Sequence, residues 1–336
     1  MFKISQELKI EFQKAKNALI EAQRIVIISH RGPDGDAVGA NLSLRLALEE
    51  MGKEVVSACT DPVPKNSDFL KKADTFVTDF NYEDFDLIMT VDCAALKLAV
   101  FPELKPEILE GPKPFVNFDH HISNDDFGTI NPVDSDASST CEILFKFLRY
   151  CKWHISRDIA TTLLHGIYFD TGGMMHSNTT SEVYKIAGKL MSLGADLKKI
   201  SKELFHTTST NKLRLWGRIL ERAYVNEEGV TVSAVNSDDY MATQTAPTDT
   251  GGAIDYLNAV PDSKYCVLLS EDREKGIVKG SLRTQRDDVN LSEVASQWGG
   301  GGHPKASGFG VDGKLKPVTV WKVVDEDGGG DMRIEF

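Results

Sequence analysis

Four short runs rich in β-branched and aromatic residues punctuate the first third of the chain. They are RIVIIS (24–29), EVVSA (54–58), DLIMTV (86–91) and PFVNF (114–118). Apolar runs of this length without polar alternation are typical of strands buried on both faces. The segments between them are long enough for crossover connections, which join parallel strands and place helices on both faces of a sheet. We therefore predict an α/β fold built on a parallel sheet.

The rest of the chain predicts helices and then a second group of strands. Leu8, Phe12, Ala15 and Leu19 recur at helical spacing within 5–23, and most of 138–205 is predicted to be helical. Strands return at 230–235, 264–270 and 276–284, while the tail (328–336) is ambiguous between a strand and a frayed end. A chain of 336 residues has room for two domains. We predict an N-terminal domain with the parallel sheet (1–195), a helical linker (196–222) and a smaller α/β domain with a mixed sheet (223–336).

Composition excludes several classes of protein. The chain has 38 basic and 50 acidic residues, a net charge of −12, which disfavours binding to long duplex nucleic acid. Its five cysteines, at 59, 93, 141, 151 and 266, form no C-x-x-C pair, so we expect reduced thiols and no disulfide framework or zinc ribbon. No apolar run approaches the ~18 residues of a membrane span, and the charged N-terminus is unlike a signal peptide. We expect a soluble, cytoplasmic protein without membrane contact.

Polar clusters follow three of the predicted strands, and a fourth ends a predicted helix. Because the carboxyl ends of parallel strands share one edge of a sheet, the first three should meet there. Each cluster alone has an ordinary explanation as a turn, a helix cap (Asp36 for the helix that follows) or a solvated loop. The residues concerned are His30, Asp34 and Asp36; Asp92; Asp119, His120 and His121; and Asp170.

Carboxylates and imidazoles without thiolates favour Mn²⁺ or Mg²⁺ over structural zinc. Four aspartates would repel one another, and two divalent ions ~3.5–4 Å apart would neutralise them and suit phosphoester hydrolysis. The six candidate ligands are His30, Asp34, Asp36, Asp92, His120 and Asp170. Asp119 is a candidate for orienting a neighbouring imidazole. The Asp170-Thr-Gly sequence also occurs in aspartic proteases, but that chemistry needs two such aspartates and the chain has one copy.

A glycine-rich segment, GGGGHPKAS (299–307), is a second candidate site. It is not a P-loop, but its four glycines (299–302) let backbone N–H groups approach an anion, and His303 adds a donor. Arg283 is a candidate phosphate clamp. The alternative for the glycine-rich segment is a flexible surface loop, and the alternative for Arg283 is an ordinary surface residue of a strand. His176 and Asn178 either line a pocket after Asp170 or cap a helix, and we interpret His154, His165 and His206 as structural.

Five motifs in order resemble those of the DHH phosphoesterase family: HRGPDGDAVG, TVDC, FDHH, GIYFDTGG and GGGGHPKASGF. The resemblance covers nearly the whole chain, as an N-terminal DHH domain and a C-terminal DHH-associated domain. This two-domain layout is similar to that of nanoRNase/pAp phosphatases. It implies an enzyme that hydrolyses short oligoribonucleotides to mononucleotides and 3′-phosphoadenosine-5′-phosphate (pAp) to AMP by in-line attack of water, and it leaves a homodimer open.

The resemblance also implies roles for single residues. His30, Asp34 and Asp92 would hold one Mn²⁺, and Asp36, Asp92, His120 and Asp170 a second, with Asp92 bridging and with Mg²⁺ or Co²⁺ as alternative ions. Asp119 would orient the ligands without binding a metal ion itself, and His121 would contact the scissile phosphate. Arg283, Gly301, Gly302 and His303 would grip the far end of the nucleotide. Residues 172–176 read GGMMH, where relatives often have an aromatic or arginine contact.

Two further functions stay open. A phosphodiesterase acting on cyclic di-AMP or linear pApA would use the same two domains. A catalytically silent nucleotide- or RNA-binding module is a different class, and the presence of all six presumed ligands argues against it. An inorganic pyrophosphatase is less favoured because the motif around His303 belongs to the nucleotide-acting relatives.

Overall fold

The computed structural model describes residues 2–317, 323–324 and 331–332. The chain divides into two compact units, residues 1–208 and 209–336, which are described separately. The expected domain boundaries at 195 and 222 stay predictions. Most of the ambiguous tail (328–336) lies outside the described residues, and Asp331–Met332 pairs with Val323–Val324 as a short two-stranded sheet.

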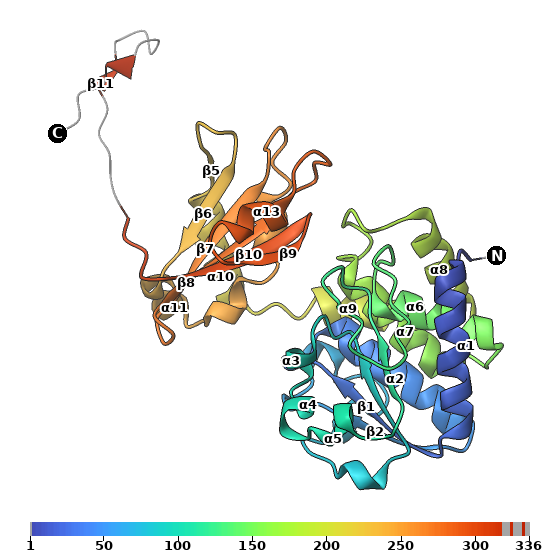
Figure 1. Cartoon of the computed structure of the whole chain (residues 1–336). Helices are drawn as coiled ribbons and strands as arrows, with labels where there is room; N and C mark the ends of the chain where they lie inside the picture. The colour runs from blue at the N-terminus through green and yellow to red at the C-terminus, as the bar shows by residue number, and fades with distance from the viewer. Residues whose placement is uncertain (1, 318–322, 325–330, 333–336) are drawn as a thin grey trace. The chain divides into compact units, whose positions relative to one another are not determined.

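The first unit alternates strands and helices before it becomes wholly helical (Figure 1). In chain order its elements are α1 (Gln6–Glu21), β1 (Arg24–Ser29), α2 (Gly35–Glu50), β2 (Glu54–Ala58), the 3₁₀ turns η1 (Lys65–Ser67), η2 (Ala73–Thr75) and η3 (Tyr82–Asp84), β3 (Leu87–Val91), α3 (Leu96–Ala99), α4 (Phe101–Leu104), α5 (Glu107–Glu110), β4 (Phe115–Phe118), α6 (Thr140–Cys151), α7 (Arg157–Asp170), α8 (Ser181–Ser192) and α9 (Leu197–Phe205).

The four strands form one parallel sheet in the order β2-β1-β3-β4. Alternate residues of β1 enter two different hydrophobic clusters: Ile25 and Ile27 pack with the α1, α2, α6 and α7 side, and Val26 and Ile28 with the side that contains Phe101 of α4. The sheet is therefore buried on both faces, as the unbroken apolar runs predict. All four carboxyl ends point to the same edge of the sheet, where the site is found.

The second unit is built around a mixed sheet. Its elements are α10 (Thr210–Glu221), β5 (Tyr224–Val225), β6 (Thr231–Val235), α11 (Ser237–Thr243), the 3₁₀ turn η4 (Pro247–Thr250), α12 (Ala253–Leu257), β7 (Cys266–Asp272), β8 (Ile277–Arg283), α13 (Leu291–Ser296), β9 (Gly301–His303) and β10 (Ala306–Asp312), followed by β11 (Val323–Val324) and β12 (Asp331–Met332).

The six strands lie in the order β5-β6-β7-β8-β10-β9, with β6 and β7 parallel and the other pairs antiparallel. One face packs Cys266 and Leu268 against α10 and α12, and the other packs Leu282 against α13. The predicted α/β fold with a parallel sheet and a smaller mixed-sheet unit is confirmed. None of the helices in the described part of the chain has the length and apolar character that a membrane crossing requires.

Candidate metal centre

The polar residues that follow β1, β3 and β4 converge at the carboxyl edge of the first sheet, where α7 also ends. Among the described residues, three groups of side chains place a ligand atom from each member within 4.8 Å of the others. They are His30, Asp34 and Asp92; Asp36, His120 and Asp170; and Asp92, His120 and His121. Asp92 and His120 each belong to two groups, so the groups form one continuous cluster.

The first group brings together the loop after β1 and the end of β3. His30 Nε2 lies 3.7 Å from Asp92 Oδ2. Asp34 caps α2, since its Oδ1 accepts hydrogen bonds from the backbone N–H groups of Asp36 (2.9 Å) and Ala37 (3.0 Å). The alternative reading of Asp36 as the cap of this helix was wrong: Asp36 lies within the first turn, where its carboxylate accepts from the backbone of Thr140.

Asp92 sits at the centre of the cluster in an unusual backbone conformation. Its φ of +57° belongs to the left-handed region, and its N–H donates to Phe118 O at 2.9 Å. The side chain is almost completely buried. Burial alone would raise the pKa of the Asp92 carboxyl, but His30, His120 and His121 outweigh burial and hold that pKa below its usual range.

The imidazoles are oriented by protein acceptors. The Nδ1–H of His30 donates to Arg31 O at 2.9 Å, and the Nδ1–H of His120 donates to Ala137 O at 3.4 Å. A carbonyl oxygen can only accept, so Nδ1 carries the proton in both rings and Nε2 faces the aspartates. His120 Nε2 is 3.5 Å from Asp92 Oδ1 and 3.2 Å from Asp170 Oδ2. A ring held through one nitrogen with the other free is the usual arrangement of a metal-binding histidine.

Asp119 occupies a different position from the other aspartates. It is fully buried and belongs to none of the three groups. Its Oδ1 accepts from His121 Nδ1 at 2.8 Å, and its Oδ2 accepts from Asn124 Nδ2 at 2.6 Å. Burial lowers the pKa of His121, but Asp119 and Asp92 outweigh burial and raise it to about 9. Sequence reasoning missed Asn124, which reads as an ordinary loop residue.

The start of α6 supplies further contacts that the sequence analysis missed. The Thr140 hydroxyl donates to Asp92 Oδ1 at 2.9 Å. The backbone N–H groups of Thr140 and Cys141 donate to Asp36 Oδ2 (2.6 Å) and Oδ1 (3.1 Å). A Ser-Ser-Thr sequence before an apolar helical run signals a helix start, but it does not indicate that two distant aspartates lie beside that start.

Helices α2 and α7 approach one another closely behind the cluster. A Cβ on Gly39 would lie 2.7 Å from Thr162 O, and a Cβ on Gly166 would lie 2.5 Å from Asp36 Oδ1. Side chains at these positions would force the two helices apart. Because Asp36 is on α2 and Asp170 is the last residue of α7, this close packing sets the distance between two of the clustered carboxylates.

The cluster concentrates negative charge in a buried place. Burial first, and then the neighbouring carboxylates, raise the pKa of Asp36 and of Asp170 well above the usual value. Cations placed between these groups would relieve the repulsion. Carboxylate and imidazole donors without a thiolate fit Mn²⁺ or Mg²⁺. The residues present therefore fit a divalent-metal centre.

His176 and Asn178 lie beside the cluster and contact its backbone. His176 Nδ1–H donates to Asp170 O at 3.0 Å. Asn178 Nδ2 donates to Ser138 O at 3.0 Å and to Asp170 O at 3.3 Å. These contacts hold the turn after α7, so the structure places both side chains where they support Asp170. Their predicted contact with substrate stays a prediction.

The remaining predicted residues belong to the second unit. Arg283, Ala306 and His303 are consecutive cross-strand partners on β8, β10 and β9, so their side chains share one face of the sheet. His303 Nδ1 accepts from Lys305 N at 3.2 Å, so in the neutral ring Nε2 carries the proton. The glycine-rich segment is thus a β-hairpin and not a flexible loop.

Gly301 and Gly302 differ in their surroundings. Gly302 pairs with Ser307 and has a φ of +139°. A Cβ there would lie 2.7 Å from Ala306 O, whereas a Cβ on Gly301 would meet nothing within 4 Å. Gly301 faces the same side as Arg283 and His303, because it pairs with Gly308 two residues along β10. Of these two glycines, Gly301 is the one with open space beside its α-carbon.

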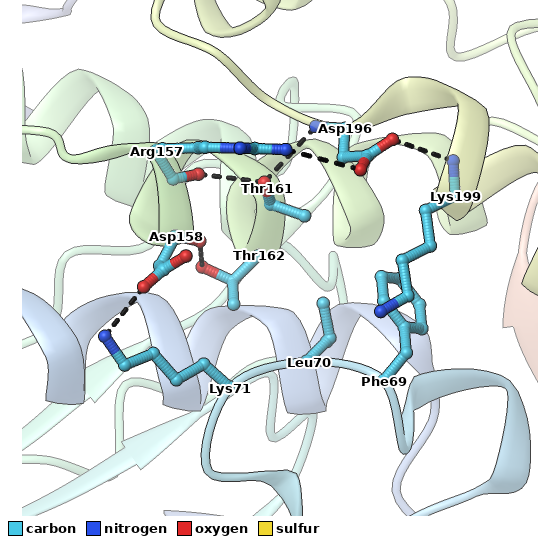
Figure 2. Close-up of a pocket in the computed structure, with 9 residues that line it drawn as sticks. All are labelled: Phe69, Leu70, Lys71, Arg157, Asp158, Thr161, Thr162, Asp196 and Lys199. Carbon is cyan, nitrogen blue, oxygen red and sulfur yellow. Dashed lines mark hydrogen bonds and ion pairs between the residues drawn. The ribbon is translucent and has the colours of Figure 1, made fainter.

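The first unit also has a pocket of about 370 Å³ at the other end of α7, away from Asp170 (Figure 2). Its charged side chains pair with one another: Lys71 with Asp158 at 2.7 Å, and Arg157 with Asp196 at 3.5 Å. Lys199 lies over the Phe69 ring, 5.1 Å from its centroid. None of the predicted site residues lines this pocket.

Comparison with known protein families and sequences agrees with this geometry. Residues 24–167 match the family model described as "DHH family, N-terminal domain", and residues 227–326 match the DHHA1 domain. The bifunctional oligoribonuclease and PAP phosphatase NrnA of Thermus thermophilus is 30% identical over 291 residues, 86% of this chain and 84% of that protein. The cyclic-di-AMP phosphodiesterase GdpP of Geobacillus thermodenitrificans is 26% identical over 302 residues, 86% of this chain but 44% of the relative.

Solved structures show the same fold. An exopolyphosphatase-related protein from Bacteroides fragilis superposes with a TM-score of 0.80 at 26% identity, covering 91% of this chain and 92% of that one. RecJ of Thermus thermophilus in complex with Mn²⁺ gives a TM-score of 0.52 at 14% identity, over 93% of this chain and 53% of RecJ. The chain belongs to the DHH family and is a phosphoesterase composed of a DHH domain and a DHHA1 domain.

Proposed function

We propose that the protein is a Mn²⁺-dependent phosphoesterase that hydrolyses short oligoribonucleotides to mononucleotides and pAp to AMP. The observation that carries the proposal is the position of Asp92, whose carboxylate is shared between two groups of potential metal ligands. The similarity to NrnA over most of both chains supports the choice of substrates.

In this proposal His30, Asp34 and Asp92 hold one divalent ion, and Asp36, Asp92, His120 and Asp170 hold the other. Bound ions of this kind lower the pKa of a water molecule and neutralise charge on the phosphoryl group. The chain's own contribution is to keep the ligand atoms in place before the ions arrive. The Nδ1–H bonds of His30 and His120 do this for the two imidazoles.

His121 is the proposed contact to the scissile phosphate. Its Nδ1 is committed to Asp119, so its Nε2 is the atom that remains to donate to a phosphoryl oxygen. Asp119 is itself fixed by Asn124, which also donates to Cys93 O at 3.0 Å. The pair Asp119–His121 thus presents a ring N–H donor whose direction is set by the loop after β4.

The second unit is proposed to bind the rest of the nucleotide. The face that carries Arg283 and His303 offers a guanidinium and a ring N–H, both suited to phosphate oxygens. Next to them, Gly301 has no Cβ and leaves space for a ligand to approach the backbone. The net charge of −12 disfavours long polyanions and suits small substrates in the cytoplasm.

A cyclic di-AMP or pApA phosphodiesterase is the second candidate. It is favoured by one observation, the 26% identity to GdpP over 86% of this chain. Because the chain spans 44% of GdpP, the activity of that larger protein is not transferred here without a test.

The test is a hydrolysis panel with Mn²⁺ present, using pAp, pApA, five-nucleotide RNA, cyclic di-AMP and pyrophosphate. The chain is compared with Asp92→Ala and with Asp158→Ala, an exposed aspartate on α7 that pairs with Lys71. We expect turnover of pAp and short RNA that Asp92→Ala abolishes and Asp158→Ala retains. A clear preference for cyclic di-AMP would replace the proposal with the second candidate. Nucleotide binding without hydrolysis of any substrate would contradict both.

A further inference from the structure

One short segment, Ala137–Cys141, contacts three of the six proposed metal ligands directly and a fourth through Asn178, although it contains none of them. It joins the loop after β4 to the first turn of α6. The segment makes these contacts mainly through its backbone, which is where sequence patterns are least informative.

Thr140 is the residue of this segment whose side chain contacts Asp92, while the Cys141 thiol lies 3.7 Å from Asp36 O. Thr140 is fully buried, and its hydroxyl donates to Asp92 Oδ1 at 2.9 Å. Asp92 Oδ1 also lies 3.5 Å from His120 Nε2. The hydroxyl therefore occupies one side of this oxygen and restricts how the carboxylate can rotate.

The backbone of the same residues fixes Asp36. The N–H groups of Thr140 and Cys141 donate to its two carboxylate oxygens, at 2.6 and 3.1 Å. These N–H groups lie in the first turn of a 12-residue helix, where they have no partner within the helix. The carboxylate thus receives one donor on each oxygen and is held flat against the start of α6.

The carbonyl groups of the segment restrain two further ligands. Ala137 O accepts the Nδ1–H of His120 at 3.4 Å. Ser138 O accepts Asn178 Nδ2 at 3.0 Å, and the same amide group donates to Asp170 O at 3.3 Å. Residues from α2, from the end of β3 and from the loop after β4 therefore contact one stretch of five residues, and Asp170 of α7 is linked to it through Asn178.

We propose that Ala137–Cys141 is the element that sets the geometry of the metal centre before metal binds, and that Thr140 is the positioning residue through which it fixes Asp92. This inference rests on the proposed function, since it assumes that the clustered residues bind divalent ions. It assigns no contact with substrate to Thr140. The consequence is that metal affinity depends on a hydroxyl that is not itself a ligand.

The experiment measures Mn²⁺ binding to the metal-free, full-length chain by calorimetric titration and by the signal of free Mn²⁺ in electron paramagnetic resonance. Thr140→Val keeps the shape and removes the donor, whereas Thr140→Ser keeps the donor. The matched control is Thr162→Val, a buried threonine on α7 whose hydroxyl bonds only to backbone carbonyls. Thr140→Ala, compared with Thr140→Ser, isolates the hydroxyl if the valine variant does not fold.

We expect Thr140→Val and Thr140→Ala to weaken Mn²⁺ binding roughly 10- to 100-fold, the range found when partners of metal ligands are removed. Thr140→Ser and Thr162→Val should keep the affinity of the unmodified chain, and raised Mn²⁺ should restore hydrolysis to Thr140→Val. Equal affinity of all variants would overturn the inference, as would a loss in Thr140→Ser as large as in Thr140→Ala. If the unmodified chain bound no Mn²⁺, the proposed function itself would fall, which is a distinguishable result.

Discussion

His120, which follows β4, and Asp170, the last residue of α7, approach to 3.2 Å between Nε2 and Oδ2. The contact joins the edge of the sheet to a helix from the second half of the unit. It exists because α7 runs back toward the sheet and ends at the carboxyl edge. Any change that displaces either side chain should therefore alter the centre without altering the fold.

Asp170→Asn is expected to reduce hydrolysis roughly 10³-fold or more, because an amide removes one negative charge and a strong oxygen donor from the proposed metal site. Mn²⁺ affinity, measured by titration of the metal-free chain, should fall with it. The control is Asp158→Asn in the first turn of the same helix, where the carboxylate meets only Lys71 and the helix start. A variant with normal Mn²⁺ affinity and activity would remove Asp170 from the centre.

His121→Asn is expected to separate catalysis from metal binding. If His121 contacts the phosphoryl group, its loss should lower kcat by roughly 10²-fold while Mn²⁺ affinity changes little. The measurement is steady-state hydrolysis of pAp at saturating Mn²⁺ beside a metal titration. The comparison variant is His120→Asn, which should lose both properties. Parallel losses in the two variants would make His121 a ligand.

Gly302→Ala and Gly301→Ala should affect two different properties, the stability of the protein and its affinity for substrate. The alanine at 302 would have a φ of +139° and a Cβ 2.7 Å from Ala306 O, so we expect a loss of about 1–3 kcal/mol in the free energy of unfolding. At 301 the methyl group meets nothing, so stability should be kept while KM rises if substrate approaches that face. Denaturant unfolding and steady-state kinetics measure the two effects. Equal stability losses would show that the hairpin needs both glycines for its fold.

The stability of the chain should carry a pH dependence from His165. This histidine is fully buried on α7, where Ser67 Oγ lies 2.9 Å from Nε2 and the Phe69 ring meets it edge-on. Burial lowers its pKa from 6.5 to about 4. Below pH 6.5 the unfolded chain takes up a proton that the folded chain refuses, so stability falls as the pH drops from about 6.5 to about 4.

Linkage gives this residue a contribution of roughly 3 kcal/mol across that interval. His165→Leu should abolish the contribution, so the difference in unfolding free energy between the two proteins should change with pH in that range and be constant above it. His154→Gln, at an exposed position, serves as the control and should leave the pH profile unchanged. A constant difference between pH 4 and 7 would show that His165 titrates normally.

The features that could be predicted from the sequence are those that local hydrophobic patterns encode. Leu8, Phe12, Ala15 and Leu19 are all buried on α1, and the apolar runs are the four parallel strands. These features depend on local periodicity, which a single chain displays directly. The meeting of the polar residues that follow these strands could also be predicted, because parallel strands end at one edge of a sheet.

Contacts between distant backbone groups could not be predicted in the same way. Thr140 reads as the start of a helix, and nothing in its neighbourhood indicates that Asp36 and Asp92 lie beside it. Asn124 is equally inconspicuous. The hairpin at Gly301–His303 was missed because four glycines suggest freedom, whereas pairing with β10 restrains them. For Thr140 the partners are distant, at 48 and 104 positions along the chain, a separation that a local pattern does not encode.

Gly39 and Gly166 influence the spacing of carboxylates in the proposed centre, although neither residue is a ligand. The absence of a side chain at these two positions lets α2, which carries Asp36, pack closely against α7, which ends at Asp170. A methyl group on Gly39 would lie 2.7 Å from Thr162 O and would push α7 away from α2 without contacting any proposed ligand atom. The spacing of Asp36 and Asp170, and with it the size of the ion that the proposed centre would hold, thus depends partly on two residues that offer no ligand atom.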